Sequence, residues 1–493
     1  MSEAVKAGAE ARLGKGLDPS ILRDYDIRGV VDVTLHEADA RAVGAGFAAV
    51  MREKTAPRTP RIVVGRDGRL SSPRLEEALV EGLRAGGADV VCIGLSTTPM
   101  LYYAEAALRL GELASAQPVD GGIQVTGSHN PKDHNGFKLV CAGLPFFGAD
   151  LQRLNARIIG GVPQAPVIPQ GLVEQREVLK AYIDRLLVDL DSVDAEALRS
   201  LRIGWDAGNG AAGPVIEALT ARLPGEHHLL FTDVDGDFPH HHPDPTVETN
   251  LADLRALVVA KRLDFGVAFD GDADRIGLID GQGRVVWGDQ ILAILAQDLL
   301  GRLPGAEILA DVKSSQALFD HVTACGGRPS MWKTGHSHIK SRMKESGAPL
   351  AGEMTGHIFF AENWYGFDDG VLAALRLMAA TAGLGRSIAD LASALPQKAA
   401  TPELRIAVAP GERPLDLVAA VRRAVEEVAE AEGLEMNPID GLRVTSADGW
   451  WLLRASNTEA KLSARAEGHD AMALDRVMAD LKARLAAVGV TLG

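Results

Sequence analysis

The residues best suited to chemistry are concentrated in segment 126–138, Thr-Gly-Ser-His-Asn-Pro-Lys-Asp-His-Asn-Gly-Phe-Lys. The apolar run Ile-Gln-Val before it indicates a short strand, and the Gly, Asn-Pro and Asn-Gly that follow predict a loop with Ser128 at its tip. A serine hydroxyl is a poor nucleophile until a base or cations assist it. His129, Lys132 and Lys138 could supply cations, and cations suit phosphoryl transfer better than acyl transfer.

A serine hydrolase would normally place its nucleophile in a Gly-x-Ser-x-Gly turn, and here Ser128 is followed by His-Asn-Pro. Acyl transfer is therefore the weaker alternative. A Ser-His-Asn-Pro turn by itself is most often structural, with Ser and Asn binding backbone groups. A catalytic interpretation needs support from other segments.

A second candidate site follows the apolar run 265–269, where residues 270–275 read Asp-Gly-Asp-Ala-Asp-Arg. Alternate side chains of an extended segment point to the same side. If this loop is extended, Asp270, Asp272 and Asp274 should therefore face the same way. Three converging carboxylates repel one another unless a cation lies between them, and hard oxygen ligands suit Mg²⁺. The EF-hand alternative fails because the required glycine and glutamate do not follow. A solvated acidic turn is the simpler alternative, and the apolar strands on both sides make it the less favoured one.

Three further segments carry weaker signals. Residues 352–357, Gly-Glu-Met-Thr-Gly-His, offer groups that could hydrogen-bond sugar hydroxyls, although a structural turn would look the same. Residues 454–459, Arg-Ala-Ser-Asn-Thr-Glu, offer a guanidinium, hydroxyls and an amide, as a phosphate-binding loop needs. Residues 22–29 alternate in charge and, taken alone, are typical of an exposed turn.

Composition restricts the class of protein. A chain of 493 residues with 46% hydrophobic residues can form several hydrophobic cores. A net charge of -15 without a basic stripe argues against nucleic-acid or anionic-membrane partners. Three cysteines without metal-ligand spacing fit a reducing cytoplasm, and we expect no signal peptide or membrane-spanning segment. The expected protein is a cytoplasmic monomer, with a dimer as the alternative.

The chain repeats one strand–helix–strand plan three times. Its first strands, at 61–64, 201–205 and 308–310, are each followed closely by an aspartate and then a helix, which predicts three similar α/β domains around mixed sheets. Ligands of such sheets gather beyond the carboxyl ends of the strands. Each repeat should therefore contribute a loop to a shared site.

The last part of the chain has a different order of elements. A strand at 404–408, a helix at 415–432, strands near 442–445, 450–453 and 462–466, and a helix at 471–487 predict a smaller α+β domain with an antiparallel sheet. A linker is expected near residues 396–402. The predicted division is a flexible tail (1–17), domain I with the serine loop (18–174), domain II with the metal loop (175–284), domain III with the sugar loop (285–396) and domain IV with the phosphate loop (397–493).

These motifs, in this order and on these four parts, resemble those of the α-D-phosphohexomutase superfamily, and most of all its bacterial phosphomannomutase/phosphoglucomutase branch. The resemblance extends from about residue 22 to residue 467. It implies four domains around a central cleft and an isomerase that moves phosphate between O6 and O1 of mannose and glucose phosphates. It also implies a phosphoserine enzyme, a 1,6-bisphosphate intermediate, glucose 1,6-bisphosphate as activator and one Mg²⁺ per chain.

The resemblance also assigns roles to individual residues. It implies that Ser128 carries the phosphate, that Asp270, Asp272 and Asp274 hold Mg²⁺ together with the seryl phosphate, and that Arg275 faces this phosphate. Residues implied to line the reaction centre are Tyr25, Arg28, His129, Lys138, Lys313 and His336, with Arg28, Lys138 and His357 as candidates for proton transfer. Sugar contacts are implied for Glu353, Thr355 and His357, and a clamp on the second phosphate for Arg454, Ser456, Asn457 and Thr458.

Three alternative functions remain open. A phosphoglucosamine mutase would resemble this chain, although Met354 stands where those enzymes typically carry glutamine. A metal-dependent sugar phosphatase would need no second phosphate clamp, and a non-catalytic phosphosugar-binding protein would not need Ser128 and the aspartates. Departures from the usual pattern at Gly127, Leu22 and Ala460 remove no reacting group, but they bear on loop rigidity and substrate preference.

Overall fold

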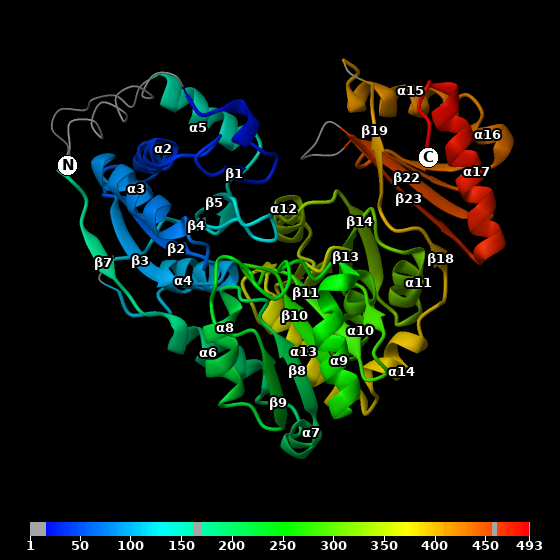
Figure 1. Ribbon diagram of the computed structural model, residues 1–493, viewed down its shortest axis with the longest axis horizontal. Helices are drawn as coiled ribbons and strands as arrows, with labels where there is room; N and C mark the ends of the chain where they lie inside the picture. The colour runs from blue at the N-terminus through cyan, green and yellow to red at the C-terminus, as the bar shows by residue number, and fades with distance from the viewer. Residues whose placement is uncertain (1–15, 116, 161–168, 410, 456–460, 493) are drawn as a thin grey trace. The chain divides into compact units, whose positions relative to one another are not determined.

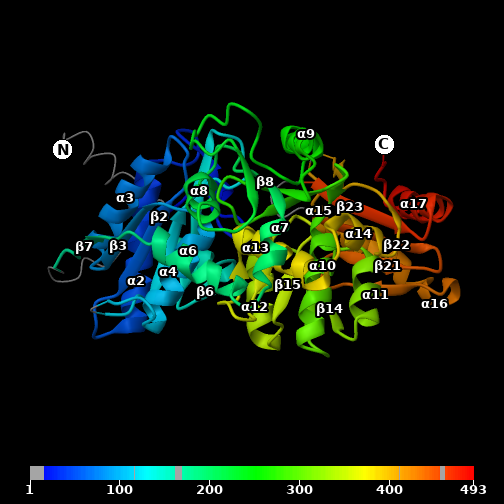
Figure 2. The same ribbon diagram turned by 90° about the horizontal axis from the view of Figure 1, so that it is seen from below.

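The computed structural model describes residues 16–115, 117–160, 169–409, 411–455 and 461–492. The chain divides into two compact units, residues 1–291 with 355–389, and residues 292–354 with 390–493. Unit 1 contains two mixed sheets covered by helices. Unit 2 contains parallel strands with their helices and a separate antiparallel sheet with helices (Figures 1 and 2). Among the described residues, no helix combines the length and apolar character needed to cross a bilayer.

The first α/β layer of unit 1 contains a seven-stranded sheet among the described residues, in the order β1-β5-β4-β2-β3-β7 with β6 beside β5. Its strands are β1 (Ile27–Val30), β2 (Arg61–Arg66), β3 (Asp89–Leu95), β4 (Gly121–Val125), β5 (His134–Cys141), β6 (Leu144–Pro145) and β7 (Val173–Gln175). Its helices are η1 (Pro19–Ile21), α2 (Glu37–Thr55), α3 (Ser72–Ala85), α4 (Thr98–Leu110), α5 (Ala149–Ile159) and α6 (Leu179–Leu187). Strands β2, β3 and β4 are parallel, and β5 runs antiparallel to β4 and β1.

Helices cover both faces of this sheet, as period-two alternation of side chains requires. A side chain added at Gly121 would face Phe47 of α2, and one added at the next residue, Gly122, would face Leu101 of α4. Both faces of the central strands are thus buried, which explains the near-continuous apolar sequence of β2, β3 and β4.

The second α/β layer of unit 1 has a five-stranded sheet within the described chain, ordered β12-β11-β10-β8-β9. The strands are β8 (Arg202–Asp206), β9 (Glu226–Leu230), β10 (Phe265–Phe269), β11 (Ile276–Asp280) and β12 (Val285–Val286). The helices are η2 (Val188–Leu190), α7 (Ala195–Ser200), α8 (Ala212–Thr220), η3 (Glu248–Leu251) and α9 (Ala252–Lys261). Strands β8, β9 and β10 are parallel, and β10 and β11 form an antiparallel hairpin whose connection is the acidic loop.

The third repeat is divided between the two units. Unit 2 contains the parallel strands β13 (Glu307–Asp311), β14 (Arg328–Trp332) and β15 (Leu350–Gly352), with α11 (Gln316–Ala324) and α12 (His336–Ser346). Unit 1 contains the antiparallel pair β16 (Ile358–Phe360) and β17 (Phe367–Asp368), followed by α13 (Gly370–Leu384). The chain passes between the units within α10 (Gly288–Arg302), between Met354 and Thr355, and within α14 (Ile388–Ser393).

The C-terminal part of unit 2 is an antiparallel sheet, six-stranded within the described residues, ordered β18-β23-β22-β21-β20 with β19 beside β23. Its strands are β18 (Ala399–Ala400), β19 (Leu404–Ala407), β20 (Glu435–Asn437), β21 (Leu442–Thr445), β22 (Gly449–Ala455) and β23 (Lys461–Gly468). Its helices are α15 (Pro414–Glu426), α16 (Ala429–Glu432) and α17 (Ala471–Ala487). Apolar residues of α15, α17 and the sheet form one core, as expected for an α+β domain.

The predicted fold class is confirmed, and four local expectations are wrong. Residues 27–30 form strand β1 rather than an exposed turn, since their pairing with β5 buries them. The predicted helix 415–432 is interrupted between α15 and α16. Ala399 and Ala400 of the predicted linker pair with β23 as strand β18. Arg454 lies inside β22 rather than in a loop after it.

Candidate active site

The loop that carries Ser128 is held by the aspartate at the end of β2. Asp67 Oδ2 accepts hydrogen bonds from Thr126 Oγ1 at 2.9 Å and from the Gly127 amide at 3.0 Å. Thr126 Oγ1 in turn accepts from the Ser128 amide at 2.8 Å. These bonds hold Ser128 in the left-handed region, at a φ of 48°, which is unusual for a residue with a side chain.

The hydroxyl of Ser128 points at the acidic loop of the second repeat. Its Oγ donates to Asp270 Oδ2 at 2.7 Å and lies 3.1 Å from His129 Nδ1. The side chain is buried rather than exposed at a loop tip as the sequence predicted, since the acidic loop covers it. The structure therefore brings together the two segments that the sequence singled out.

The acidic loop gathers its three carboxylates in a tight turn. Ligand atoms of Asp270, Asp272 and Asp274 all lie within 4.8 Å of one another, and all three side chains are buried. The loop is not extended as predicted, because Ala273 has a φ of 59° and its amide donates to the carbonyl of Asp270 at 3.0 Å. The turn, rather than the alternation of a strand, makes the carboxylates converge.

These residues fit a divalent cation. The buried Oδ1 of Asp272 has no hydrogen-bond partner among the described residues, whereas its Oδ2 is bound by Thr98 and Lys138. Burial and the neighbouring carboxylates of Asp272 and Asp274 raise the pKa of Asp270 well above its ordinary range. Buried, mutually repelling carboxylate oxygens are the donor set that a hard cation stabilises.

Lys138 is a cation that the protein itself supplies to Asp272 and Asp274 of this cluster. Its ammonium lies 2.7 Å from Asp272 Oδ2 and also pairs with Asp274. Burial lowers the pKa of Lys138, but the carboxylates of Asp272, Asp274 and Asp270 outweigh this effect and raise it. Conversely, burial and Asp274 raise the pKa of Asp272, and Lys138 more than compensates, so that the net shift is downward.

Arg28 of β1 reaches the serine loop from another side. Its Nη1 donates to the Gly127 carbonyl at 2.9 Å and to Asn130 Oδ1 at 2.7 Å, and its Nη2 pairs with Asp26. The preceding Tyr25 is partly buried just before this strand. Arg28 is thus a buried cation that binds the loop on both sides of Ser128, the predicted nucleophile.

Two of the cations predicted for the serine loop do not fill that role. Burial, together with the nearby Arg275 and Arg28, lowers the pKa of His129 well below its ordinary value and so opposes a positive charge on its ring. Lys132 is exposed and lies 2.8 Å from Asp237, away from Ser128. Of the three, Lys138 alone combines charge with a place at the acidic cluster.

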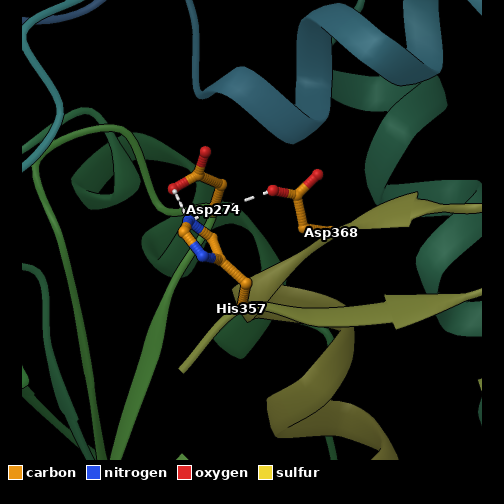
Figure 3. Close-up of side chains that lie close together, drawn as sticks. All are labelled: Asp274, His357 and Asp368. Atoms are coloured by element: carbon orange, nitrogen blue, oxygen red, sulfur yellow. Dashed lines mark ion pairs between the residues drawn. The ribbon is translucent and has the colours of Figure 1, made fainter. Parts of the chain in front are cut away.

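His357 joins this cluster from the segment before β16. Its Nε2 lies 3.3 Å from Asp274 Oδ1 and 4.0 Å from Asp368 Oδ2, so that the ring stands between two carboxylates (Figure 3). Arg275 Nε lies 3.2 Å from the same nitrogen of His357, and the Arg275 amide donates to Asp270 Oδ1 at 3.2 Å. His357 therefore connects the third repeat to the acidic loop within unit 1. Thr355 lies partly buried in the same unit.

Unit 2 contains a second group of predicted residues. Lys313 lies 3.5 Å from Glu403, and Arg454 lies 3.1 Å from Asp440. Lys313 lowers the pKa of Glu403 to about 2, and Arg454 adds to the effect. Both cations are buried, so unit 2 holds two paired positive charges near Glu403.

His336 and Glu353 belong to the same unit. His336 opens α12, and the amide of the preceding Gly335 donates to the buried carboxylate of Glu353. The Thr334 amide donates at 3.2 Å to Asp440, the partner of Arg454. The predicted phosphate-binding residues Ser456, Asn457 and Thr458 lie outside the described residues.

Several residues that support the site were missed in the sequence. Asp67 holds the serine loop, Thr98 binds Asp272, Asp368 faces His357, and Asp440 and Glu403 pair with the cations of unit 2. A usable signal existed for Asp67, which follows the first strand of its repeat. For the others the contact depends on tertiary packing, which leaves no local pattern.

Phosphoryl transfer requires a nucleophile, neutralising cations and a positioned acceptor, and catalysis rests mainly on their placement. The fold and the cluster around Ser128 together define an enzyme of this class. Family models described as phosphoglucomutase/phosphomannomutase match the chain in sequence: alpha/beta/alpha domain I at residues 20–160, domain II at 180–283, domain III at 287–399 and the C-terminal domain at 403–484. The chain belongs to the phosphoglucomutase/phosphomannomutase family.

Individual relatives are similar along nearly the whole chain. A phosphomannomutase/phosphoglucomutase of Pseudomonas putida is 42% identical over 461 residues, 94% of each chain. A phosphoglucomutase of Neisseria gonorrhoeae is 40% identical over 94% of this chain and 96% of its own. The crystal structure of a phosphoglucomutase/phosphomannomutase family protein from Burkholderia thailandensis matches with a TM-score of 0.87 and 40% identity, covering 97% of this chain and 100% of that one.

We predict that Mg²⁺ and Lys138 stabilise the same carboxylates. Replacing Lys138 with Met leaves Asp272 and Asp274 buried without their cation, a change that typically costs about 3–5 kcal/mol of folding free energy. Added Mg²⁺ should recover part of that loss, so the melting temperature should rise more with Mg²⁺ in Lys138→Met than in the wild type. Thermal unfolding in excess chelator and in excess Mg²⁺ measures this difference.

Lys132→Met is the matched control, because Lys132 is exposed and remote from the acidic cluster. Its response to Mg²⁺ should equal that of the wild type. An equal Mg²⁺ response in all three proteins would contradict a cation site at these aspartates.

Proposed function

We propose that this protein is a phosphohexomutase that interconverts the 6-phosphates and 1-phosphates of mannose and glucose. The observation that carries the proposal is the hydrogen bond of 2.7 Å from Ser128 Oγ to Asp270, at a cluster of carboxylates and buried cations. Membership of the phosphoglucomutase/phosphomannomutase family supports it independently. The predicted monomeric state and cytoplasmic location remain predictions.

In the proposed reaction, Ser128 carries a phosphoryl group on Oγ. The free hydroxyl of a bound hexose phosphate attacks it, the bond from phosphorus to Ser128 Oγ breaks, and the sugar becomes a 1,6-bisphosphate. After the intermediate turns round, Ser128 Oγ attacks the other phosphate and releases the isomeric monophosphate. Phosphate and protons are conserved over the cycle, since the attacking hydroxyl loses one proton and the product hydroxyl gains one.

The residues around Ser128 have distinct parts in this proposal. Asp270 accepts the hydrogen bond of the serine hydroxyl and so orients Oγ when no phosphate is attached. Arg28 and Lys138 bring positive charge to the loop and the acidic cluster, where negative charge develops on the phosphoryl oxygens. Arg28, Lys138 and His357 remain the candidates for moving the proton of the sugar hydroxyl.

Asp270, Asp272 and Asp274, together with phosphorylated Ser128, would hold Mg²⁺. Bound there, the ion would neutralise phosphoryl oxygens and so favour their transfer. The fit rests on the converging buried oxygens and the unpartnered Oδ1 of Asp272. Glucose 1,6-bisphosphate, as the intermediate of the glucose reaction, would restore the phosphate on Ser128 whenever the intermediate is lost.

We propose that unit 2 binds the phosphate that is not transferred. Its support is the pair of buried cations, Lys313 and Arg454, each held by a carboxylate. Glu353 would contact the sugar. The predicted domain boundaries remain part of the proposal, with one loop contributed by each domain.

The first test concerns Ser128. Ser128→Ala should lose nearly all turnover, because alanine has no hydroxyl to carry the phosphate, while binding of glucose 1-phosphate should persist. Intact mass should show one phosphate on the wild type after incubation with glucose 1,6-bisphosphate and none on Ser128→Ala. Ser200→Ala, at an exposed serine, is the control. Phosphate on another residue would overturn the assignment.

The second test concerns the sugar. Glu353, Thr355 and His357 offer contacts to equatorial hydroxyls, and no residue of the predicted set distinguishes the axial from the equatorial O2. Mannose and glucose 1-phosphates should therefore both react, and coupled assays of kcat/KM with each sugar measure the ratio. A preference above roughly a thousandfold, about 4 kcal/mol of transition-state discrimination, would require an O2-reading group. Glucosamine 1-phosphate in the same assay tests the alternative mutase.

The third test concerns Arg454. A charge-assisted bond to phosphate is worth about 1.5–3 kcal/mol, so Arg454→Ala should lower kcat/KM roughly ten- to a hundredfold and release more 1,6-bisphosphate per turnover. Arg413→Ala, at an exposed arginine, should change neither. Asp440→Asn removes the ion pair and keeps the guanidinium. If Arg454→Ala changes neither kcat/KM nor the release of 1,6-bisphosphate, Arg454 only pairs with Asp440 and does not bind the phosphate.

A further inference from the structure

We propose that Arg69 is a positioning residue for the phosphate carrier, because its guanidinium binds four carbonyls of the serine loop and so sets the direction of Ser128 Oγ. This inference rests on the proposed role of Ser128. Arg69 does not touch a reacting atom, and its effect would pass through the backbone of the loop.

The contacts of Arg69 account for both terminal nitrogens of its guanidinium. Nη2 donates to the carbonyls of Ser128 and Asn130, each at 2.6 Å. Nη1 donates to the carbonyls of Pro131 at 2.6 Å and His134 at 3.0 Å. The side chain is 1% exposed, so its guanidinium has exchanged water for carbonyls that it binds as one rigid donor fork.

Asp67 and Arg69 act on the loop as a complementary pair. Asp67 accepts from the donors of the loop, the Thr126 hydroxyl and the Gly127 amide, whereas Arg69 donates to its carbonyls. Arg69 Nε lies 3.3 Å from Asp67 Oδ2, and Asp67 Oδ1 accepts from the Arg69 amide at 3.0 Å. The two opposite charges thus hold the backbone on both sides of Ser128.

The Ser128 carbonyl is restricted from a second direction as well. A side chain at Gly271, in the acidic loop, would come within 2.5 Å of this oxygen, so the two loops are in close contact there. With its carbonyl fixed by Arg69 and Gly271, Ser128 is kept in its left-handed conformation, which directs Oγ to Asp270. Loss of Arg69 would let the peptide after Ser128 rotate and the hydroxyl with it.

The surroundings of Arg69 leave little freedom for the guanidinium. A methyl group at Gly127 would lie 2.3 Å from Arg69 Nε and 2.4 Å from Cζ, so glycine at 127 makes the room that Arg69 occupies. Phe238 of the second repeat lies with its ring centre 5.3 Å from Arg69 Cζ. The same guanidinium therefore contacts both repeats that build the site.

Arg69→Lys tests the inference, with Arg74→Lys as the matched control. Lysine keeps the charge but cannot bind four carbonyls in two directions, whereas Arg74 forms exposed ion pairs with Asp32 and Glu37. For a loop displaced by ~1 Å, kcat should fall roughly ten- to a hundredfold, with KM changed less than about threefold. The rate at which glucose 1,6-bisphosphate phosphorylates the protein, followed by intact mass, should fall with kcat. Arg74→Lys should match the wild type.

Gly127→Ala supplies a second variant that leaves Arg69 in the sequence. Its methyl group should displace the guanidinium and lower kcat and the phosphorylation rate in the same way. Lysine is shorter than arginine and leaves space for the methyl group. The fold-decrease in kcat of the double variant Gly127→Ala/Arg69→Lys should therefore be smaller than the product of the fold-decreases of the two single variants.

The outcomes separate positioning from stability. A merely structural Arg69 would lower the melting temperature of Arg69→Lys while kcat and the phosphorylation rate stayed within about twofold of the wild type, and this result would overturn the inference. Should Arg69→Lys fail to fold, unchanged kinetics in Gly127→Ala would overturn it instead. If instead the proposed function is wrong, the wild type itself will take up no phosphate at Ser128, and this result is distinct from the two above.

Discussion

The repulsion among three buried carboxylates is the constraint on which unit 1 depends. Asp270, Asp272 and Asp274 follow one strand of the second repeat, and Lys138, the cation that pairs with Asp272 and Asp274, comes from β5 of the first repeat. Antiparallel pairing of β4 with β5 sets Lys138 opposite Gln124 and so fixes where its ammonium emerges. Docking of the first two repeats and assembly of the site are therefore one event, because each contributes a charge that the other must compensate.

The aspartate that ends the first strand of each repeat supports a loop in all three cases, with different partners. Asp67 binds the serine loop, Asp206 binds the Gly208 amide and His241, and Asp311 binds Ser314, Thr334 and the Met354 amide. A carboxylate at the carboxyl end of a buried strand can accept from several loop donors at once. The aspartate at the same position of each repeat thus holds a loop of different chemistry. The loops can therefore differ in sequence while the aspartate continues to hold them in place.

The sequence predicted the helices and strands, and which loops carry candidate reacting groups, better than it predicted the residues that support those loops. Strand-ending motifs around Ser128 and Asp270 were identifiable because glycines and aspartates break apolar runs there. The four carbonyls bound by Arg69 belong to the backbone, which carries no residue-specific signal. Lys132 and Lys138 looked equivalent in sequence, and only the register of β5 separates an exposed lysine from a buried one. For His129, the expectation of a charge failed because burial and neighbouring arginines oppose it.

Four of the predicted site cations share a property that bears on how a chain of net charge -15 could bind phosphates. Lys138 pairs with Asp272 and Asp274, Arg28 with Asp26, Lys313 with Glu403 and Arg454 with Asp440. An unpaired buried cation would cost several kcal/mol of desolvation, so each partner carboxylate makes the burial possible and also fixes the side-chain direction. Because the carboxylate already holds the cation in place, a phosphate that binds the cation does not have to restrict its motion. The carboxylate also competes for the cation and so limits how tightly the phosphate is held. Weak retention of this kind suits the proposed reaction, in which a bisphosphate dissociates from its contacts, turns and binds again, because very tight binding of either phosphate would slow the reorientation.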